Sequence, residues 1–211
     1  MKCNKDSLLL YAVTDRHWLN DDVEKAIKGG VTFVQLREKD DMAMPHDEFL
    51  AEAKEIAALC RKYSVPFVID DDVQIAQESG ADGVHVGQHD MEAGMVRKKL
   101  GRDKILGVSV QTVKEALLAQ KRGADYLGVG AVFKTGSKND ADDVRTEMLK
   151  AICDAVDIPV VAIGGITEDN VTELAGSGIC GIAVISAIFA KNNIQKATRD
   201  LKKKALKVIS K

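Results

Sequence analysis

The sequence lacks the features that mark membrane-spanning, secreted and metal-cluster proteins. None of its apolar runs approaches the roughly 20 residues that cross a bilayer, and Met1–Asp6 is not followed by the small-residue cleavage site of a signal peptide. The four cysteines, at positions 3, 60, 153 and 180, are far apart, without the paired spacing of zinc sites or disulfide frameworks. These absences predict a cytoplasmic protein whose cysteines are reduced and mostly serve as small core residues.

The sequence also lacks a strong charge of either sign. Its net charge of −2 at pH 7 gives no reason to expect nucleic acid or a membrane surface as a partner. The lysine-rich stretch Lys202–Lys207 is the exception, and it is best explained as the wet face of a C-terminal helix. Nucleic-acid or membrane binding through this stretch is the less favoured alternative. We therefore expect small molecules as the partners of this protein.

One unit repeats along the 211 residues: a short apolar run, a polar loop, a stretch with helical periodicity and a glycine-containing turn. The apolar runs do not alternate with polar residues, which is typical of parallel strands buried on both faces. The predicted strands are Leu8–Val13, Phe33–Leu36, Phe67–Ile69, Gly83–Val86, Ile105–Val108, Tyr126–Val129, Val160–Ile163 and Gly181–Ile185. The predicted helices are Asp22–Lys28, Asp47–Lys62, Val73–Glu78, Glu92–Leu100, Val113–Lys121, Arg145–Ala155, Glu168–Ala175 and Ile194–Ser210. Thr112 and Glu115 predict a capping box at the start of the fifth helix.

Eight such units predict a single-domain (β/α)8 TIM barrel over residues 1–211, and no Pro/Ser-rich linker divides the chain. The alternative is an open doubly wound sheet, which usually has five or six strands and a glycine fingerprint in its first strand-to-helix turn. Here that turn, Val13–His17, contains no glycine. In a TIM barrel the active site lies where the strands end, so the residues that follow each strand are the candidates.

Basic residues follow the second predicted strand. Alternate residues of a strand face the same side, so Gln35, Arg37 and Lys39 share one side. An apolar barrel interior excludes such charges unless anions meet them at its mouth. The arginine fork and the lysine ammonium both suit phosphate. The alternative is a surface ion-pair network with Glu38 and Asp40.

Aspartates follow the third and fourth predicted strands. Asp70, Asp71 and Asp72 come from one loop and Asp90 from the next, and consecutive barrel strands are neighbours. Mg²⁺ typically takes one or two carboxylates and completes its shell with water and substrate phosphate. The alternative is that Asp72 caps the helix that begins at Val73, which accounts for only one of these aspartates. Clustered negative charge favours a cation here.

The remaining loops carry hydroxyls and glycines. Ser109 follows the fifth strand. The polar loop 134–140 suits close approach to an anion or closure as a lid; the alternative is a solvated loop without a role. Gly164-Gly165 and a short extra helix over Ser186–Phe189 match the phosphate site that recurs at loops seven and eight of this fold. The two clusters predict two ligands, a phosphate monoester and a more highly charged, metal-bound phosphate or pyrophosphate.

These loop motifs together resemble the thiamine phosphate synthase family, from about Tyr11 to Ile188. The motifs are QLREK at 35–39, DD at 71–72, HVGQHD at 85–90, GVS at 107–109, TGSK at 135–138, IGGI at 163–166 and ISAI at 185–188. The resemblance implies that hydroxymethylpyrimidine pyrophosphate and hydroxyethylthiazole phosphate condense to thiamine phosphate, with release of pyrophosphate and with Mg²⁺. It also implies that the carbon–oxygen bond breaks first, giving a pyrimidine-stabilised cation that the thiazole nitrogen captures.

The resemblance assigns roles to individual residues. It implies that Arg37, Lys39, Ser109 and Lys138 meet the pyrophosphate, that Gln35 orients the pyrimidine, and that Asp71 and Asp90 hold Mg²⁺. For the thiazole phosphate the implied ligands are Thr135, Ser137, Gly165, Ile185 and Ser186.

Four positions depart from the family pattern. Asp70 stands where the family usually has an asparagine that contacts the pyrophosphate, and a carboxylate there repels the leaving group unless a metal mediates or it is protonated. Ala131 and Lys134 stand where prolines are usual, and Ser137 where threonine is. These differences bear on the sixth loop and on Asp70 more than on the function.

Other activities fit the same fold. A thiazole tautomerase-like isomerase shares the motifs around Ala12–Asp15 and Val161–Gly165, but it has no use for the combination of Arg37, Lys39, Asp71, Asp90 and Lys138. A non-catalytic barrel that binds phosphate ligands, or another phosphosugar enzyme, is a further alternative because fold does not fix function.

Overall fold

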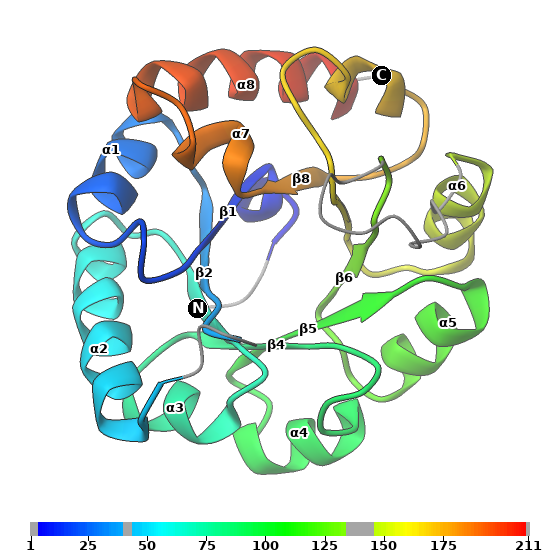
Figure 1. Ribbon diagram of the computed structural model, residues 1–211. Helices are drawn as coiled ribbons and strands as arrows, with labels where there is room; N and C mark the ends of the chain where they lie inside the picture. The colour runs from blue at the N-terminus through cyan, green and yellow to red at the C-terminus, as the bar shows by residue number, and fades with distance from the viewer. Residues whose placement is uncertain (1–3, 40–43, 134–145, 210–211) are drawn as a thin grey trace.

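The computed structural model describes residues 4–39, 44–133 and 146–209. Within these residues eight parallel strands form one closed barrel in chain order, β8 pairing back with β1. Helices surround the barrel (Figure 1). The predicted (β/α)8 barrel is confirmed, and the open doubly wound sheet is wrong because the closing pair places Leu10 beside Ile182.

The strands are β1 (Leu10–Thr14), β2 (Phe33–Leu36), β3 (Phe67–Asp70), β4 (Gly83–Val86), β5 (Ile105–Val110), β6 (Tyr126–Val129), β7 (Val160–Ile163) and β8 (Gly181–Val184). The α-helices are α1 (Asp21–Gly29), α2 (His46–Lys62), α3 (Val73–Glu78), α4 (Ala93–Leu100), α5 (Val113–Lys121), α6 (Thr146–Ala155), α7 (Ser186–Phe189) and α8 (Ile194–Ile209). Two 3₁₀ segments are η1 (Asp6–Leu8) and η3 (Val171–Leu174). No helix in this described part of the chain is both long and apolar enough to cross a membrane.

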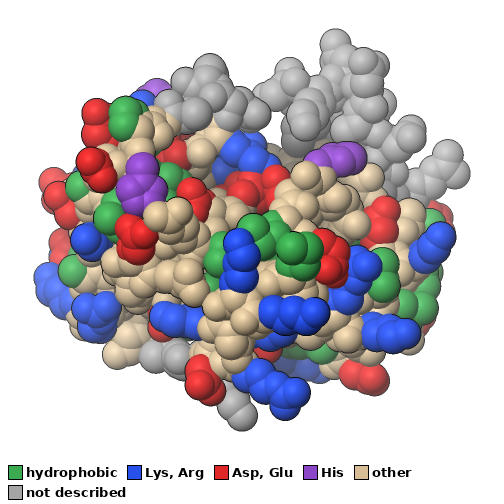
Figure 2. Space-filling view, turned by 90° about the horizontal axis from the view of Figure 1, so that it is seen from below, with side chains coloured by type: hydrophobic (Ala, Val, Ile, Leu, Met, Phe, Trp, Pro, Cys, Tyr) green, Lys and Arg blue, Asp and Glu red, His purple; other side chains and the backbone are tan. Residues whose placement is uncertain are grey.

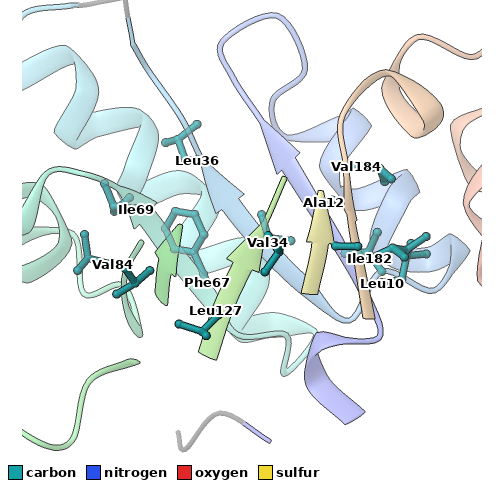
Figure 3. Close-up of a cluster of buried hydrophobic side chains, with 14 of the residues drawn as sticks. Leu10, Ala12, Val34, Leu36, Phe67, Ile69, Val84, Leu127, Ile182 and Val184 are labelled. Carbon is teal, nitrogen blue, oxygen red and sulfur yellow. The ribbon is translucent and has the colours of Figure 1, made fainter. Parts of the chain in front are cut away.

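Every strand presents one row of side chains outward to the helices. Ala12, Val34, Ile69 and Ile182 belong to this outer layer and are fully buried (Figure 3). Burying a side chain of valine or isoleucine size contributes about 1.5–3 kcal/mol. This layer, together with the inner one, explains why the strands are continuous apolar runs in the sequence.

The alternate residues of the strands fill the barrel interior. Tyr11, Phe33 and Tyr126 pack with ring centroids 4.6 Å apart for the first pair and 5.6 Å for the second. Val68 and Ile105 are buried in the same cluster. At the amino end of the strands Gly181 lies so close to the Leu8 carbonyl that a Cβ would overlap it. The interior is a packed core, so ligands are expected at the mouth of the barrel.

Apart from element ends that shift by one or two residues, the structure differs from the sequence-based elements in two places. Leu8, predicted to open the first strand, lies in η1, where Asn4 and Ser7 exchange local hydrogen bonds of 2.7 and 2.8 Å. The helix predicted over Glu168–Ala175 is wrong, because only the 3₁₀ segment η3 forms. Thr167 Oγ1 accepts from the Asn170 backbone N–H at 3.3 Å while Asn170 Oδ1 accepts from Thr167 N–H at 2.8 Å, and such side-chain bonds compete with an α-helix.

Candidate active site

The acidic and basic residues predicted for the mouth meet where β2, β3 and β4 end. Arg37 Nε lies 3.4 Å from Asp70 Oδ2. The Lys39 ammonium is in contact with the Asp71 carboxylate and lies 3.4 Å from Asp90 Oδ1. Figure 2 shows basic and acidic side chains next to one another near the upper edge of the face that it presents. Five residues from three successive loops therefore converge on one side of the rim.

Backbone geometry holds the aspartates in place. Asp71 has a φ of 58°, and its N–H donates to the His85 carbonyl at 2.7 Å, which joins the third loop to β4. Asp90 Oδ2 accepts from the Gly87 N–H at 2.8 Å. Asp72 caps α3 by accepting from Ile75 N–H at 2.9 Å, as the alternative interpretation of that one residue predicted.

Burial and close neighbours shift the pKa values of the three carboxylates at the rim. Burial, helped by the charge of Asp71, raises the pKa of Asp70 to about 7 against the opposing Arg37. Burial and the neighbouring Asp90 raise the pKa of Asp71 to about 6. Burial alone would raise the pKa of Asp90. Hydrogen bonds with Asp71 and with the Gly87 N–H outweigh burial, so the pKa of Asp90 is lowered. Three carboxylates face two cations here, so the cluster carries an excess negative charge when all three carboxylates are ionised.

The residues present fit a hard divalent cation. Both Asp71 carboxylate oxygens are buried and receive no well-aligned hydrogen bond from the described residues, although Lys39 lies against one of them. Such orphaned oxygens are suited to Mg²⁺. Within the described ranges no group of three or more His, Cys, Asp or Glu side chains could form an all-protein metal centre. A cation bound by Asp71 and Asp90 would therefore need water or substrate oxygens to complete its shell.

Gln35 and Ser109 lie deeper, at the two ends of a chain of polar groups in the barrel interior. Gln35 hydrogen-bonds to Asp70 on one side and to the Tyr11 hydroxyl on the other. The Tyr11 and Tyr126 hydroxyls are 2.9 Å apart. His85 Nδ1 lies 2.9 Å from the Tyr126 hydroxyl, and His85 Nε2 lies 2.8 Å from Ser109 Oγ.

Sequence reasoning missed Tyr11, His85 and Tyr126 as polar members of the mouth. The signal was available, because the strand pairs align Asp70 with His85, and His85 with Gly107 beside Tyr126. The side-chain alternation that selected Gln35 and Arg37 on β2 selects these residues too when it is applied to every strand. Full burial lowers the pKa of His85 to about 4, so the ring is neutral at physiological pH.

The opposite side of the mouth is built from backbone and small residues. Gly164 and Gly165 follow β7 with positive φ values of 99° and 66°. Asn170 Nδ2 donates to the Gly165 carbonyl at 2.9 Å and holds this turn. Ile185 and Ser186 are exposed where β8 passes into α7, which forms over the four residues predicted for the short extra helix. A pocket of about 160 Å³ reaches from this side, at Ile163 and Ile185, to Gln35.

Three predicted site residues, Thr135, Ser137 and Lys138, lie outside the described residues, as does Lys134. Their roles stay predictions. The convergence expected of Arg37, Asp71 and Asp90 is present, while the fourth member of that expectation, Lys138, is not described.

The closed barrel and the cluster of charged side chains at the carboxyl ends of its strands together define a TIM-barrel enzyme. The family model described as thiamine monophosphate synthase matches residues 10–188. The chain therefore belongs to the thiamine monophosphate synthase family, as the motif resemblance predicted, and membership makes it a transferase.

Individual relatives agree with this assignment. The thiamine-phosphate synthase of Clostridium tetani (strain Massachusetts / E88) is 51% identical over 91% of this chain and 93% of its own. That of Clostridium beijerinckii is 48% identical over 94% and 96%. Among solved structures, thiamine phosphate pyrophosphorylase from Pyrococcus furiosus superposes with a TM-score of 0.88 at 40% identity, covering 97% of this chain and 98% of the other.

Proposed function

We propose that this chain condenses hydroxymethylpyrimidine pyrophosphate with hydroxyethylthiazole phosphate to thiamine phosphate and pyrophosphate, in the presence of Mg²⁺. The observation that carries the proposal is the convergence of Arg37 and Lys39 with three aspartates on one side of the mouth. Family membership supports the same reaction.

The reaction needs a stabilised leaving group more than a covalent catalyst. The bond between the pyrimidine methylene carbon and the pyrophosphate oxygen breaks, and its electron pair leaves with the oxygen. The aminopyrimidine stabilises the cation left behind, and the lone pair of the thiazole nitrogen then forms the new carbon–nitrogen bond. An active site accelerates this path by holding charge on the departing oxygen and by aligning the two partners.

Arg37 and Lys39 supply positive charge for the departing pyrophosphate. Arg37 offers a planar fork of N–H donors and Lys39 a point charge, and in the free chain both are held by the aspartates. Asp71 and Asp90 would hold the divalent cation. When bound, Mg²⁺ neutralises charge that develops on the pyrophosphate oxygens. The excess negative charge of the free cluster supports a bound cation, because without one the cluster would repel an anionic substrate.

The two substrates would take opposite sides of the mouth. Gln35, which lines the pocket of about 160 Å³, would orient the pyrimidine. The turn at Gly165 and the backbone of Ile185 and Ser186 suit the thiazole phosphate, because glycine lets an anion approach the backbone closely. Ser109 and Asp70, with Thr135, Ser137 and Lys138 of the sixth loop, remain predicted substrate contacts.

The proposal is tested by incubating both phosphorylated substrates with the purified chain, with and without Mg²⁺, and by measuring thiamine phosphate. We expect product only when both substrates and Mg²⁺ are present. Chelation should abolish product without changing the circular dichroism of the protein. A folded chain that makes no thiamine phosphate under these conditions contradicts the proposal.

The same assay separates the alternative functions. A thiazole tautomerase-like isomerase would convert its thiazole substrate without the pyrimidine pyrophosphate and without Mg²⁺. A phosphate-binding barrel without catalysis would bind thiazole phosphate in calorimetry but give no turnover with either substrate. Retention of Asp71, Asp90, Arg37 and Lys39 in one cluster favours the synthase over both.

A further inference from the structure

Asp70 begins a continuous chain of hydrogen bonds that crosses the barrel interior. Its members, in order, are Asp70, Gln35, Tyr11, Tyr126, His85 and Ser109. We call this series the interior chain. It connects Asp70, the aspartate that departs from the family pattern at the end of β3, to Ser109 near the end of β5.

The direction of the first two hydrogen bonds follows from chemistry. An ionised carboxylate has no hydrogen to donate, so Gln35 must turn its Nε2 toward Asp70. The other end of the Gln35 amide is then a carbonyl oxygen, which can only accept. The Tyr11 hydroxyl must therefore donate its single hydrogen to Gln35 Oε1.

The remaining bonds follow by counting hydrogens. Since the hydrogen of Tyr11 is committed to Gln35, the 2.9 Å contact between the two hydroxyls requires Tyr126 to donate. Tyr126 then has only lone pairs to offer His85, so His85 Nδ1 must carry a hydrogen. In the neutral ring Nε2 is bare, and it accepts the hydrogen of Ser109 at 2.8 Å.

The packing around His85 leaves its ring little choice of position. A Cβ on Gly107 would overlap both the His85 and the Tyr126 rings, and one on Gly128 would lie 3.2 Å from His85 Cε1. The two glycines make the space that the ring occupies, and the side chain of His85 is buried there. Both of its nitrogens thus stay opposite hydroxyl partners, and the hydrogen-bond pattern decides the tautomer.

We propose that Asp70 is a positioning residue that sets the direction of the whole interior chain, fixing the amide orientation of Gln35 and the Nδ1–H tautomer of His85. An asparagine at this position offers an amide that can donate or accept, so it leaves both directions open. In the reverse direction Gln35 would present its NH2 to Tyr11, and His85 would carry its hydrogen on Nε2. An ionised aspartate removes that second state, because a carboxylate can only accept.

The fixed direction matters at both ends of the chain. Gln35 keeps one orientation toward the pocket, so it presents a donor and an acceptor in fixed places. The Ser109 hydroxyl hydrogen points at His85, so Ser109 offers lone pairs to the mouth, and donation from its hydroxyl to pyrophosphate requires that hydrogen to leave His85. This consequence for the reaction rests on the proposed function, whereas the hydrogen-bond direction itself does not.

The test is the tautomer of His85, measured by ¹⁵N NMR of the imidazole-labelled full chain at pH 9, without substrates or metal. The signals of His85 are identified by their absence from the His85→Gln spectrum. We expect a protonated Nδ1 and a bare Nε2. A major Nε2–H tautomer in the unmodified chain overturns the proposal, whatever becomes of any variant.

Two variants separate direction-setting from a general effect of charge. Asp70→Asn should add a second set of His85 signals from the Nε2–H tautomer, at comparable intensity. Asp72→Asn is the matched control, because it removes the same charge two residues away and keeps an N-cap on α3; it should leave the tautomer unchanged. If Asp70→Asn shows only the Nδ1–H tautomer of His85, the proposed role of Asp70 is contradicted. The same holds if the His85 signals change equally in Asp70→Asn and Asp72→Asn. Because no substrate is used, failure here is distinct from failure of the synthase assay.

Discussion

The two sides of the barrel mouth are built in different ways. Where β2, β3 and β4 end, charged side chains dominate, and Lys39 bridges Asp71 and Asp90. Where β7 and β8 end, the mouth is formed by glycines with positive φ and by the exposed residue Ile185. The first side can neutralise a leaving group whose charge grows during the reaction, and the second can hold a phosphate whose charge stays constant. Substitutions on the two sides should therefore affect different kinetic constants.

The largest effect is expected from Arg37→Ala. Removing the guanidinium should lower kcat/KM for the pyrimidine pyrophosphate about 100-fold, which corresponds to roughly 2.7 kcal/mol of transition-state stabilisation. The KM for thiazole phosphate should change little. Steady-state kinetics with each substrate varied in turn measures both constants. A loss confined to the thiazole phosphate would reverse the proposed division of the mouth.

Asp71→Ala should lower turnover by at least about tenfold, or roughly 1.4 kcal/mol in the barrier, because one of two carboxylates for the divalent cation is lost. Asp72→Asn, which keeps the cap of α3, is the matched control and should retain the turnover of the unmodified chain. A near-normal rate for Asp71→Ala at saturating Mg²⁺ would count against Asp71 as a metal ligand.

Gly165→Ala should have a smaller effect on the other side of the mouth. The φ of 66° is unfavourable for alanine by roughly 1–2 kcal/mol, so the turn should shift away from the phosphate. We expect KM for thiazole phosphate to rise about fivefold, which corresponds to roughly 1 kcal/mol, with kcat nearly unchanged. Equal changes in the constants for both substrates would show that the two sides do not act separately.

The smallest kinetic effect is expected from Thr112→Ala, because the Thr112 side chain caps α5. Thr112 and Glu115 form the predicted capping box of α5. Its loss should lower the free energy of unfolding by about 1 kcal/mol, measured by urea denaturation, while both kinetic constants stay within error. An altered KM for either substrate would mean that α5 supports the mouth directly.

The barrel and the charged side of the mouth were accessible from the sequence because each depends on local rules. Apolar runs bounded by glycine turns define the strands, and strand alternation carries Arg37 and Lys39 to the mouth. The rule that strand ends form the active site then brings Asp71 and Asp90 to them. The η3 error arose because Thr167 and Asn170 bond locally, a competition that periodicity does not register.

The interior chain was not accessible in the same way. His85 and Tyr126 each lie in an apolar run of the sequence, where a single polar side chain does not indicate a partner. Their contact becomes evident only from the strand register. The proposed direction of the hydrogen bonds depends in addition on Asp70, at a position where the family usually has asparagine. Single-residue reasoning cannot recover a property that six residues from six strands share.

The most direct test of the account is calorimetric binding of inorganic pyrophosphate to the intact chain, with and without Mg²⁺. The charge balance of Arg37, Lys39 and the three aspartates predicts that Mg²⁺ strengthens binding at least about tenfold, equivalent to roughly 1.4 kcal/mol. Asp71→Ala should lose most of this gain. Equal affinity for pyrophosphate in the presence and absence of Mg²⁺ would contradict the assignment of this side of the mouth to a metal-bound leaving group.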